Sequence, residues 1–155
     1  MRPKISIWFS ARSAVLLLPL WALCFLGCSS NGPAFHPVKG TVTFKDGTPI
    51  KYGQIVFYPD PSRGNSSREI CQGTIREGEY VLRTGTREGV PPGAYRVGIE
   101  AAVGADEKNP YYRKLATHER YINPDRSALT AEVIDRPEQG RYNFQLDPNP
   151  KLPRR

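Results

Sequence analysis

The stretch Val38-Lys39-Gly40-Thr41-Val42-Thr43-Phe44 alternates small or apolar side chains with polar ones. Successive side chains of a β-strand point to opposite faces of a sheet, so this pattern predicts a strand that is buried on one face. The inward set is Val38, Gly40, Val42 and Phe44. Asp46-Gly47 follows directly, and a Gly at that place is typical of a tight turn. The folded part of the chain is therefore expected to begin with a half-buried strand and a turn.

Six later stretches repeat this alternation, and turns rich in Gly or Pro separate them. They lie at residues 54–58, 69–76, 79–83, 94–100, 129–134 and 141–146. The 155 residues include 15 Pro and 14 Gly, a composition that favours short strands over long helices. Together with the first stretch they predict an all-β domain over residues 38–146, a single seven-stranded antiparallel β-sandwich. The tail 147–155 is rich in Pro and basic residues and is expected to be disordered.

The segment 104–125 interrupts the strand pattern. Asn109-Pro110 is a typical helix start, so this long loop is expected to hold a short helix. Long loops on a rigid scaffold often carry recognition. The aromatic and basic side chains here form the candidate binding loop: Tyr111, Tyr112, Arg113, His118, Arg120 and Tyr121. The alternative is that Tyr121 and Leu115 only cap an open end of the sandwich.

The N-terminal segment has the composition of an export signal. Basic residues and no acid precede an apolar run, Ala14–Leu26, that is too short to span a bilayer comfortably. Gly27-Cys28 ends this run and resembles the lipobox of bacterial lipoproteins, in which the signal is cut before a Cys that carries lipid. The resemblance implies a signal peptide at 1–27, a lipidated tether at 28–37 and membrane lipid as partner. An ordinary signal peptide with an incidental Cys, or an uncleaved anchor, are the alternatives.

The residue after Cys28 indicates in which membrane the protein is anchored. Ser29 follows the Cys in place of the Asp that favours inner-membrane retention in enterobacterial lipoproteins, so the resemblance favours the outer membrane of the cell envelope. Two or three buried acyl chains would hold the protein almost permanently, at about 0.8 kcal/mol for each methylene.

A second resemblance covers Val38 to Leu146. Asp46-Gly47-x-Pro49, Gly53-x-Ile55-x-Phe57, Gly78-x-Tyr80-x-Leu82 and Pro92-Gly93-x-Tyr95-x-Val97 resemble carboxypeptidase-regulatory-like domains. These have a transthyretin-like, or prealbumin-like, sandwich. Tyr121-x-Asn123-Pro124 resembles a subset found among small lipoproteins of planctomycete-type bacteria. The resemblance implies a fold and a location, but no activity.

The candidate chemistry of the chain is sparse. Its two histidines, His36 and His118, have no spacing that ties them to Cys71, which is expected to be a small buried residue. The end of the chain, 151–155, also differs from the Tyr-Arg-Gly-Ser-type end of transthyretin-fold hydrolases. We therefore expect no enzyme, no cofactor and no metal. The alternative is a small hydrolase or ligand-binding protein with a site at 104–123.

The charge of the chain limits the classes of partner that it is expected to bind. The formal net charge is +7, of which 7 − 3 = +4 remains after the three basic residues of the segment 1–27. The basic residues are scattered and no nucleic-acid-reading motif accompanies them, so a nucleic-acid partner is not expected. An envelope protein or a polysaccharide is the expected partner of the domain.

Overall fold

The computed structural model describes residues 34–103 and 114–152. In this part of the chain the regular elements are ten strands and two short 3-10 helices, which confirms the all-β prediction. None of its helices is long and apolar enough to cross a membrane. The predicted signal peptide with Gly27 and Cys28, the helix start at Asn109-Pro110, and Tyr111, Tyr112 and Arg113 lie outside the described residues.

Each predicted stretch contains a strand, and the structure has further short strands, β6 and β8, outside those stretches. The strands are β1 (Lys39–Phe44), β2 (Tyr52–Pro59), β3 (Cys71–Arg76), β4 (Glu79–Val81), β5 (Arg83–Thr84), β6 (Arg87–Glu88), β7 (Gly93–Val103), β8 (Lys114–Leu115), β9 (Thr130–Val133) and β10 (Phe144–Leu146). The 3-10 helices are η1 (Pro61–Arg63) and η2 (Glu119–Tyr121). The predicted strand at 79–83 is two strands, because the chain breaks at Leu82, whose amide bonds to the carbonyl of Val38.

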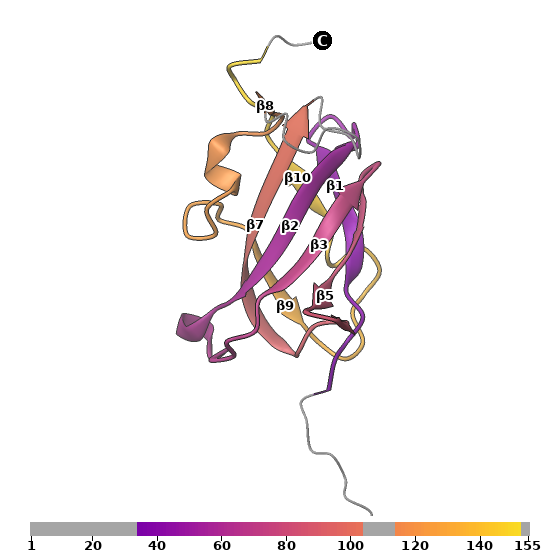
Figure 1. Cartoon of the computed structure of the whole chain (residues 1–155), viewed down its shortest axis with the longest axis vertical. Coiled ribbons are helices and arrows are strands. Elements are labelled where there is room, and N and C mark those ends of the chain that lie inside the picture. The colour runs from indigo at the N-terminus through magenta and orange to yellow at the C-terminus, as the bar shows by residue number, and fades with distance from the viewer. Residues whose placement is uncertain (1–33, 104–113, 153–155) are drawn as a thin grey trace, which may run out of the picture. The chain divides into compact units, whose positions relative to one another are not determined.

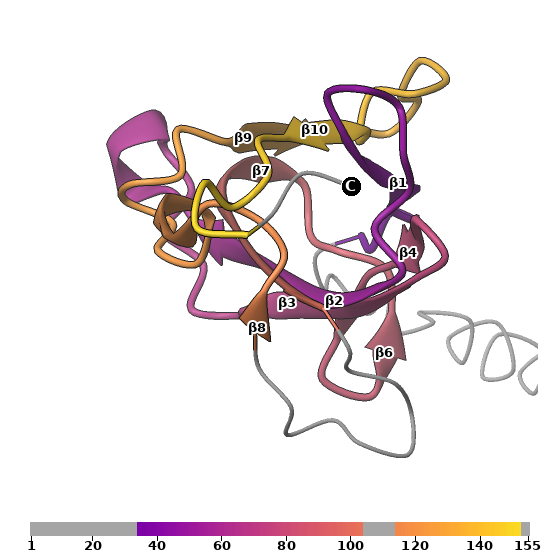
Figure 2. The same cartoon turned by 90° about the horizontal axis from the view of Figure 1, so that it is seen from above.

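The strands form one sheet that curls around a common core (Figures 1 and 2). Its order is β10-β1-β4-β3-β2-β7-β8, and β9 pairs with the first part of β7. The centre is antiparallel: β2 pairs with β7 from Gly53↔Ala101 to Pro59↔Tyr95. Figure 2 shows β9 and β10 on the side of the core opposite β2 and β3. The curl therefore gives the domain two facing walls.

One pairing departs from the predicted antiparallel sandwich. β1 and β10 are parallel, with Val42 opposite Phe144, so the sheet is mixed and the prediction of a purely antiparallel arrangement is wrong. Gly40 is the reason that the two strands can meet. A Cβ on Gly40 would lie 2.2 Å from the carbonyl oxygen of Tyr142, so only Gly admits that backbone.

The core lies between the two walls. Side chains that the alternation places inward are fully buried on the central strands, among them Ile55, Tyr95, Val97 and Ile99. The ring of Phe57 lies 5.7 Å from that of Tyr95 and 6.2 Å from that of Phe144, measured between centroids. Each such side chain stabilises the fold by about 2 kcal/mol through apolar burial.

The N-terminal end of the described chain is attached to the domain. The backbone of His36 makes two hydrogen bonds of 2.9 Å with Val90, and the Arg87 guanidinium lies 5.4 Å from the centre of the Phe35 ring. Residues 35–37 therefore belong to the domain, although the sequence predicts a tether as far as residue 37. An isolated antiparallel bridge between His36 and Val90, together with the burial of Val38, attaches this stretch to the domain.

Candidate functional site

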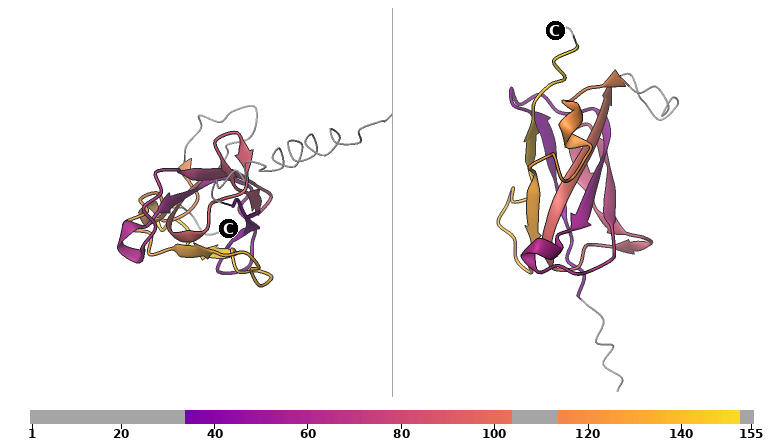
Figure 3. Two further views of the ribbon diagram at one scale, coloured as in Figure 1. Left: turned by 90° about the horizontal axis from the view of Figure 1, so that it is seen from below. Right: turned by 90° about the vertical axis from the view of Figure 1, so that its left-hand side faces the viewer.

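The site is built around η2, which packs on β7 (Figure 3). His118 caps η2: its Nδ1 accepts a hydrogen bond of 3.2 Å from the amide of Arg120. Gly98 of β7 allows the close approach, since a Cβ there would lie 3.0 Å from the carbonyl oxygen of Ile122. An Ala at residue 98 would require the backbone at Ile122 to shift by a few tenths of an ångström.

Asp147, the residue after β10, gathers three side chains from two other segments. Its Oδ2 accepts a hydrogen bond of 2.8 Å from the Tyr121 hydroxyl, and the Arg120 guanidinium also contacts it. Its Oδ1 lies 2.6 Å from Nζ of Lys45. The hydrogen bond from Lys45, followed by that from Tyr121, holds the pKa of Asp147 below its ordinary value. Asp147 is therefore a charged link between the end of β1, the end of β10 and η2.

Asp147 and Tyr121 also shift the pKa values of the two basic side chains, Lys45 and Arg120. The hydrogen bond to Asp147 raises the pKa of Lys45 above its ordinary value, and the hydrogen bond to the Tyr121 hydroxyl raises that of Arg120. Arg120 also stacks over the Tyr121 ring, at 4.8 Å from its centre. Both cations stay charged over the whole physiological range of pH.

Asn149 provides a second attachment for the C-terminal segment, residues 147–152. Its amide bonds to the carbonyl of Ala116, and its Nδ2 bonds to that of Leu115, both at 2.9 Å. The amide of His118 bonds to the carbonyl of Asp147 at 3.1 Å. The prediction of disorder from residue 147 onward is therefore wrong for residues 147–149. One carboxylate and one amide side chain supply enough hydrogen bonds to hold a Pro-rich segment in place.

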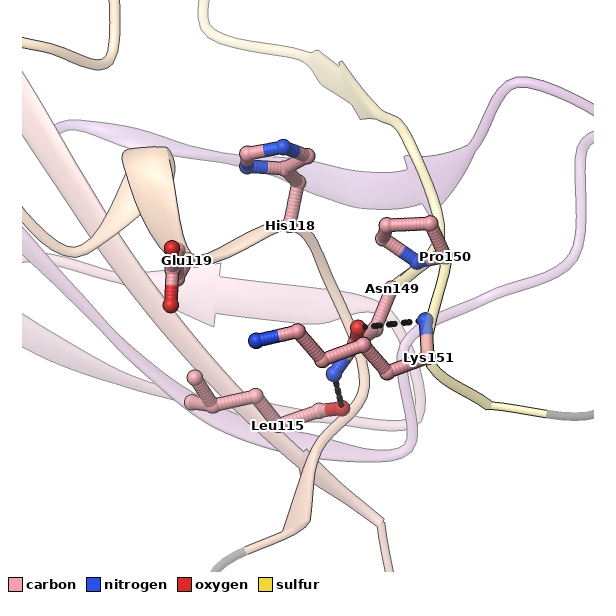
Figure 4. A pocket seen from close by; sticks show the side chains of 6 residues that line it. All are labelled: Leu115, His118, Glu119, Asn149, Pro150 and Lys151. Atoms are coloured by element: carbon pink, nitrogen blue, oxygen red, sulfur yellow. Dashed lines mark hydrogen bonds between the residues drawn. The ribbon is translucent and has the colours of Figure 1, made fainter.

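Two shallow depressions flank His118 and Glu119, which line both. The first measures about 250 Å³ and is shown in Figure 4; the second measures about 460 Å³. The other residues of the first are Leu115, Asn149, Pro150 and Lys151. The other residues of the second are Arg120, Ile122, Asn123 and Arg126.

The structure describes three of the predicted site residues, and they differ in whether they line the depressions. His118 and Arg120 line them, whereas Tyr121 is only 3% exposed and belongs to the core. Of the two residues in the capping alternative, Tyr121 thus packs in the core, whereas Leu115 is half-buried and lines the first depression. The sequence gives little sign of the other lining residues. Asn149, Lys151 and Arg126 come from loop segments without a recurring spacing, and only the fold brings them together.

Cys71 lies apart from this surface. It faces the core, as the sequence predicts, and its sulfur accepts a hydrogen bond of 3.2 Å from the Thr84 hydroxyl. Burial raises the pKa of the Cys71 thiol, which keeps it protonated and weakly nucleophilic. His118 lies on the surface at η2, so the two side chains do not converge in one site. This arrangement does not favour a thiol hydrolase at the 104–123 loop.

Within the described ranges, no three side chains of His, Cys, Asp or Glu are grouped so as to hold a metal ion. In comparisons with protein families, with curated proteins and with solved structures, no match to this chain was found. The chemistry of the surface is therefore the basis for assigning a role. It offers positive charge, amide groups and a little apolar surface.

Proposed function

We propose that this chain is a lipid-anchored protein of the cell envelope, whose β-domain is a non-catalytic structural or interaction module. The observation that carries the proposal is Gly27-Cys28 at the end of a short apolar run. The folded domain begins close behind it, at Phe35. Residues 29–34 remain as the linker, and these six residues reach at most ~20 Å when extended. Acyl chains on Cys28 would therefore keep the domain near the lipid surface.

The direction of β1 supports a role in interaction. The chain enters the domain at His36 and runs along β1 to Phe44, after which Lys45 contacts Asp147. A six-residue strand covers ~20 Å, so the Asp147 cluster lies at the far end of β1 from the attachment point. The proposed contact surface for another envelope component is therefore η2 with its depressions, at the end of β1 away from the point where the chain enters the domain. The expected component is an envelope protein or a polysaccharide.

We also propose that the curled sheet is a transthyretin-like sandwich of the carboxypeptidase-regulatory-like kind. Two facing walls around one core, with β2 and β3 on one side and β9 and β10 on the other, are compatible with it. The outer membrane is the proposed location, from the Ser that follows Cys28.

The anchoring proposal is tested by changing Cys28→Ser in the full chain. We expect loss of incorporation of an alkyne-labelled fatty acid and release from the membrane fraction, because the acylated thiol is gone. Cys24→Ser is the matched control, since this cysteine lies in the segment that is removed with the signal. Equal labelling and membrane retention in wild type and Cys28→Ser would overturn the proposal.

A further inference from the structure

We propose that the two depressions beside η2 bind an extended acidic peptide segment of another envelope protein. The inference rests on the proposed function as an interaction module and names the partner's chemistry. The depressions adjoin each other at His118 and Glu119, so a single extended chain can occupy both. Figure 4 shows the Lys151 amine extending toward the side of the first depression where Glu119 lies.

Charge favours an acidic occupant. Lys45, Arg120, Arg126 and Lys151 lie in or beside the depressions, against the carboxylates Glu119 and Asp147, which leaves 4 − 2 = +2. Asp147 is already shared by Lys45 and Arg120. Within the described residues, Arg126 and Lys151 have no ion-pair partner, so both are available to carboxylates of a ligand.

The basic side chain at the centre is held in position before a ligand arrives. The Arg120 guanidinium donates a hydrogen bond of 2.8 Å to the Tyr121 hydroxyl, contacts Asp147 and stacks on the Tyr121 ring. The Tyr121 ring is itself buried. A side chain that is already ordered loses less conformational entropy when a ligand binds.

Two observations favour a peptide over a polysaccharide. Ile122, in the second depression, is 40% exposed and offers an apolar contact that a peptide side chain can use. Sugars bind flat aromatic faces, but among the described residues no Phe, Tyr or Trp lines either depression, and the Tyr121 ring under Arg120 is only 3% exposed. The surface thus suits a chain that combines carboxylates with apolar side chains.

The test uses the full chain solubilised in detergent and a fluorescein-labelled peptide of Glu-Glu-Leu repeats, about nine residues long, which spans ~30 Å. Binding is measured by fluorescence anisotropy. We expect Arg126→Glu to weaken the affinity about tenfold, and Ile122→Ser to weaken it several-fold. The matched controls are Arg136→Glu, at a side chain that is 94% exposed, and Ile70→Ser, which is 51% exposed. Both controls are expected to bind like the wild type, and thermal unfolding checks that all four variants are folded.

Several outcomes would overturn the inference. These are absence of binding at about 1 mM peptide, equal weakening by Arg126→Glu and Arg136→Glu, or equally tight binding of the same peptide with Lys in place of Glu. Competition by alginate oligomers as effective as that of unlabelled peptide would assign the surface to an anionic polysaccharide instead. The Cys28→Ser chain is expected to bind the peptide like the wild type. Failure of lipid anchoring and failure of peptide binding are thus separate results.

Discussion

The hydroxyl of Tyr121 donates a hydrogen bond of 2.8 Å to Oδ2 of Asp147, and thereby links η2 to the residue that follows β10. The same hydroxyl accepts hydrogen bonds from the Arg120 guanidinium and from the amide of Asp147. One buried tyrosine thus connects a loop and a strand that are 26 residues apart in the chain. The link positions both depressions, because it fixes η2 and the C-terminal segment with respect to each other.

Changing Tyr121→Phe is expected to reduce the free energy of unfolding by about 1–2 kcal/mol, because it leaves the ring in the core and removes the hydroxyl from three hydrogen bonds. Chemical denaturation at pH 7 measures the change. Tyr58→Phe is the matched control, since Tyr58 is partly buried but its hydroxyl has no hydrogen bond within the described residues. Equal destabilisation by the two changes would show that the Tyr121 hydroxyl contributes nothing specific.

The ionisation of Asp147 is expected to make the stability of the domain depend on pH. Its pKa is lower in the folded protein than the ordinary value of 3.8, so its contribution is fully present above about pH 3.8 and is lost as the pH falls through the folded pKa. Asp147→Asn should therefore lower the Tm at pH 7, and the difference from wild type should shrink below pH 3.8.

Thermal unfolding between pH 7 and pH 2 measures this effect. Glu138→Gln, at an exposed position, is the control for the loss of a negative charge and should shift the Tm little at any pH. A difference between wild type and Asp147→Asn that stays constant down to pH 2 would contradict the role of the Asp147 charge.

Local alternation was sufficient to predict most of the strands. Tyr95, Val97 and Ile99 of β7 are each completely buried, as their positions two residues apart require. The pairing partners could not be predicted in the same way. Val42 and Phe144 pair across 144 − 42 = 102 residues, and no local pattern states whether such a pair is parallel.

The candidate site was only partly predictable for a related reason. Aromatic and basic composition pointed to His118 and Arg120, and both line the depressions. The same composition did not distinguish Tyr121, whose burial depends on the fit of its ring under Arg120 and against the core. Asn149 lies between two prolines, so its neighbours suggested disorder. Its two hydrogen bonds to the β8 region exist only once the sheet has formed.

Gly40→Ala is expected to destabilise the domain by roughly 2–3 kcal/mol. The new Cβ would lie 2.2 Å from the carbonyl oxygen and 2.8 Å from the carbonyl carbon of Tyr142, which are backbone atoms that no side-chain rotation can move away. The strain should fall on the parallel pairing of β1 with β10, so amide hydrogen exchange should accelerate at Thr43 and Gln145 more than at Ile55 and Ile99. Lys39→Ala, at an exposed position on the same strand, is the control for the propensity of Ala in a strand. Unfolding free energies that agree within about 0.5 kcal/mol for the two variants would show that the sheet tolerates a wider separation of β1 and β10.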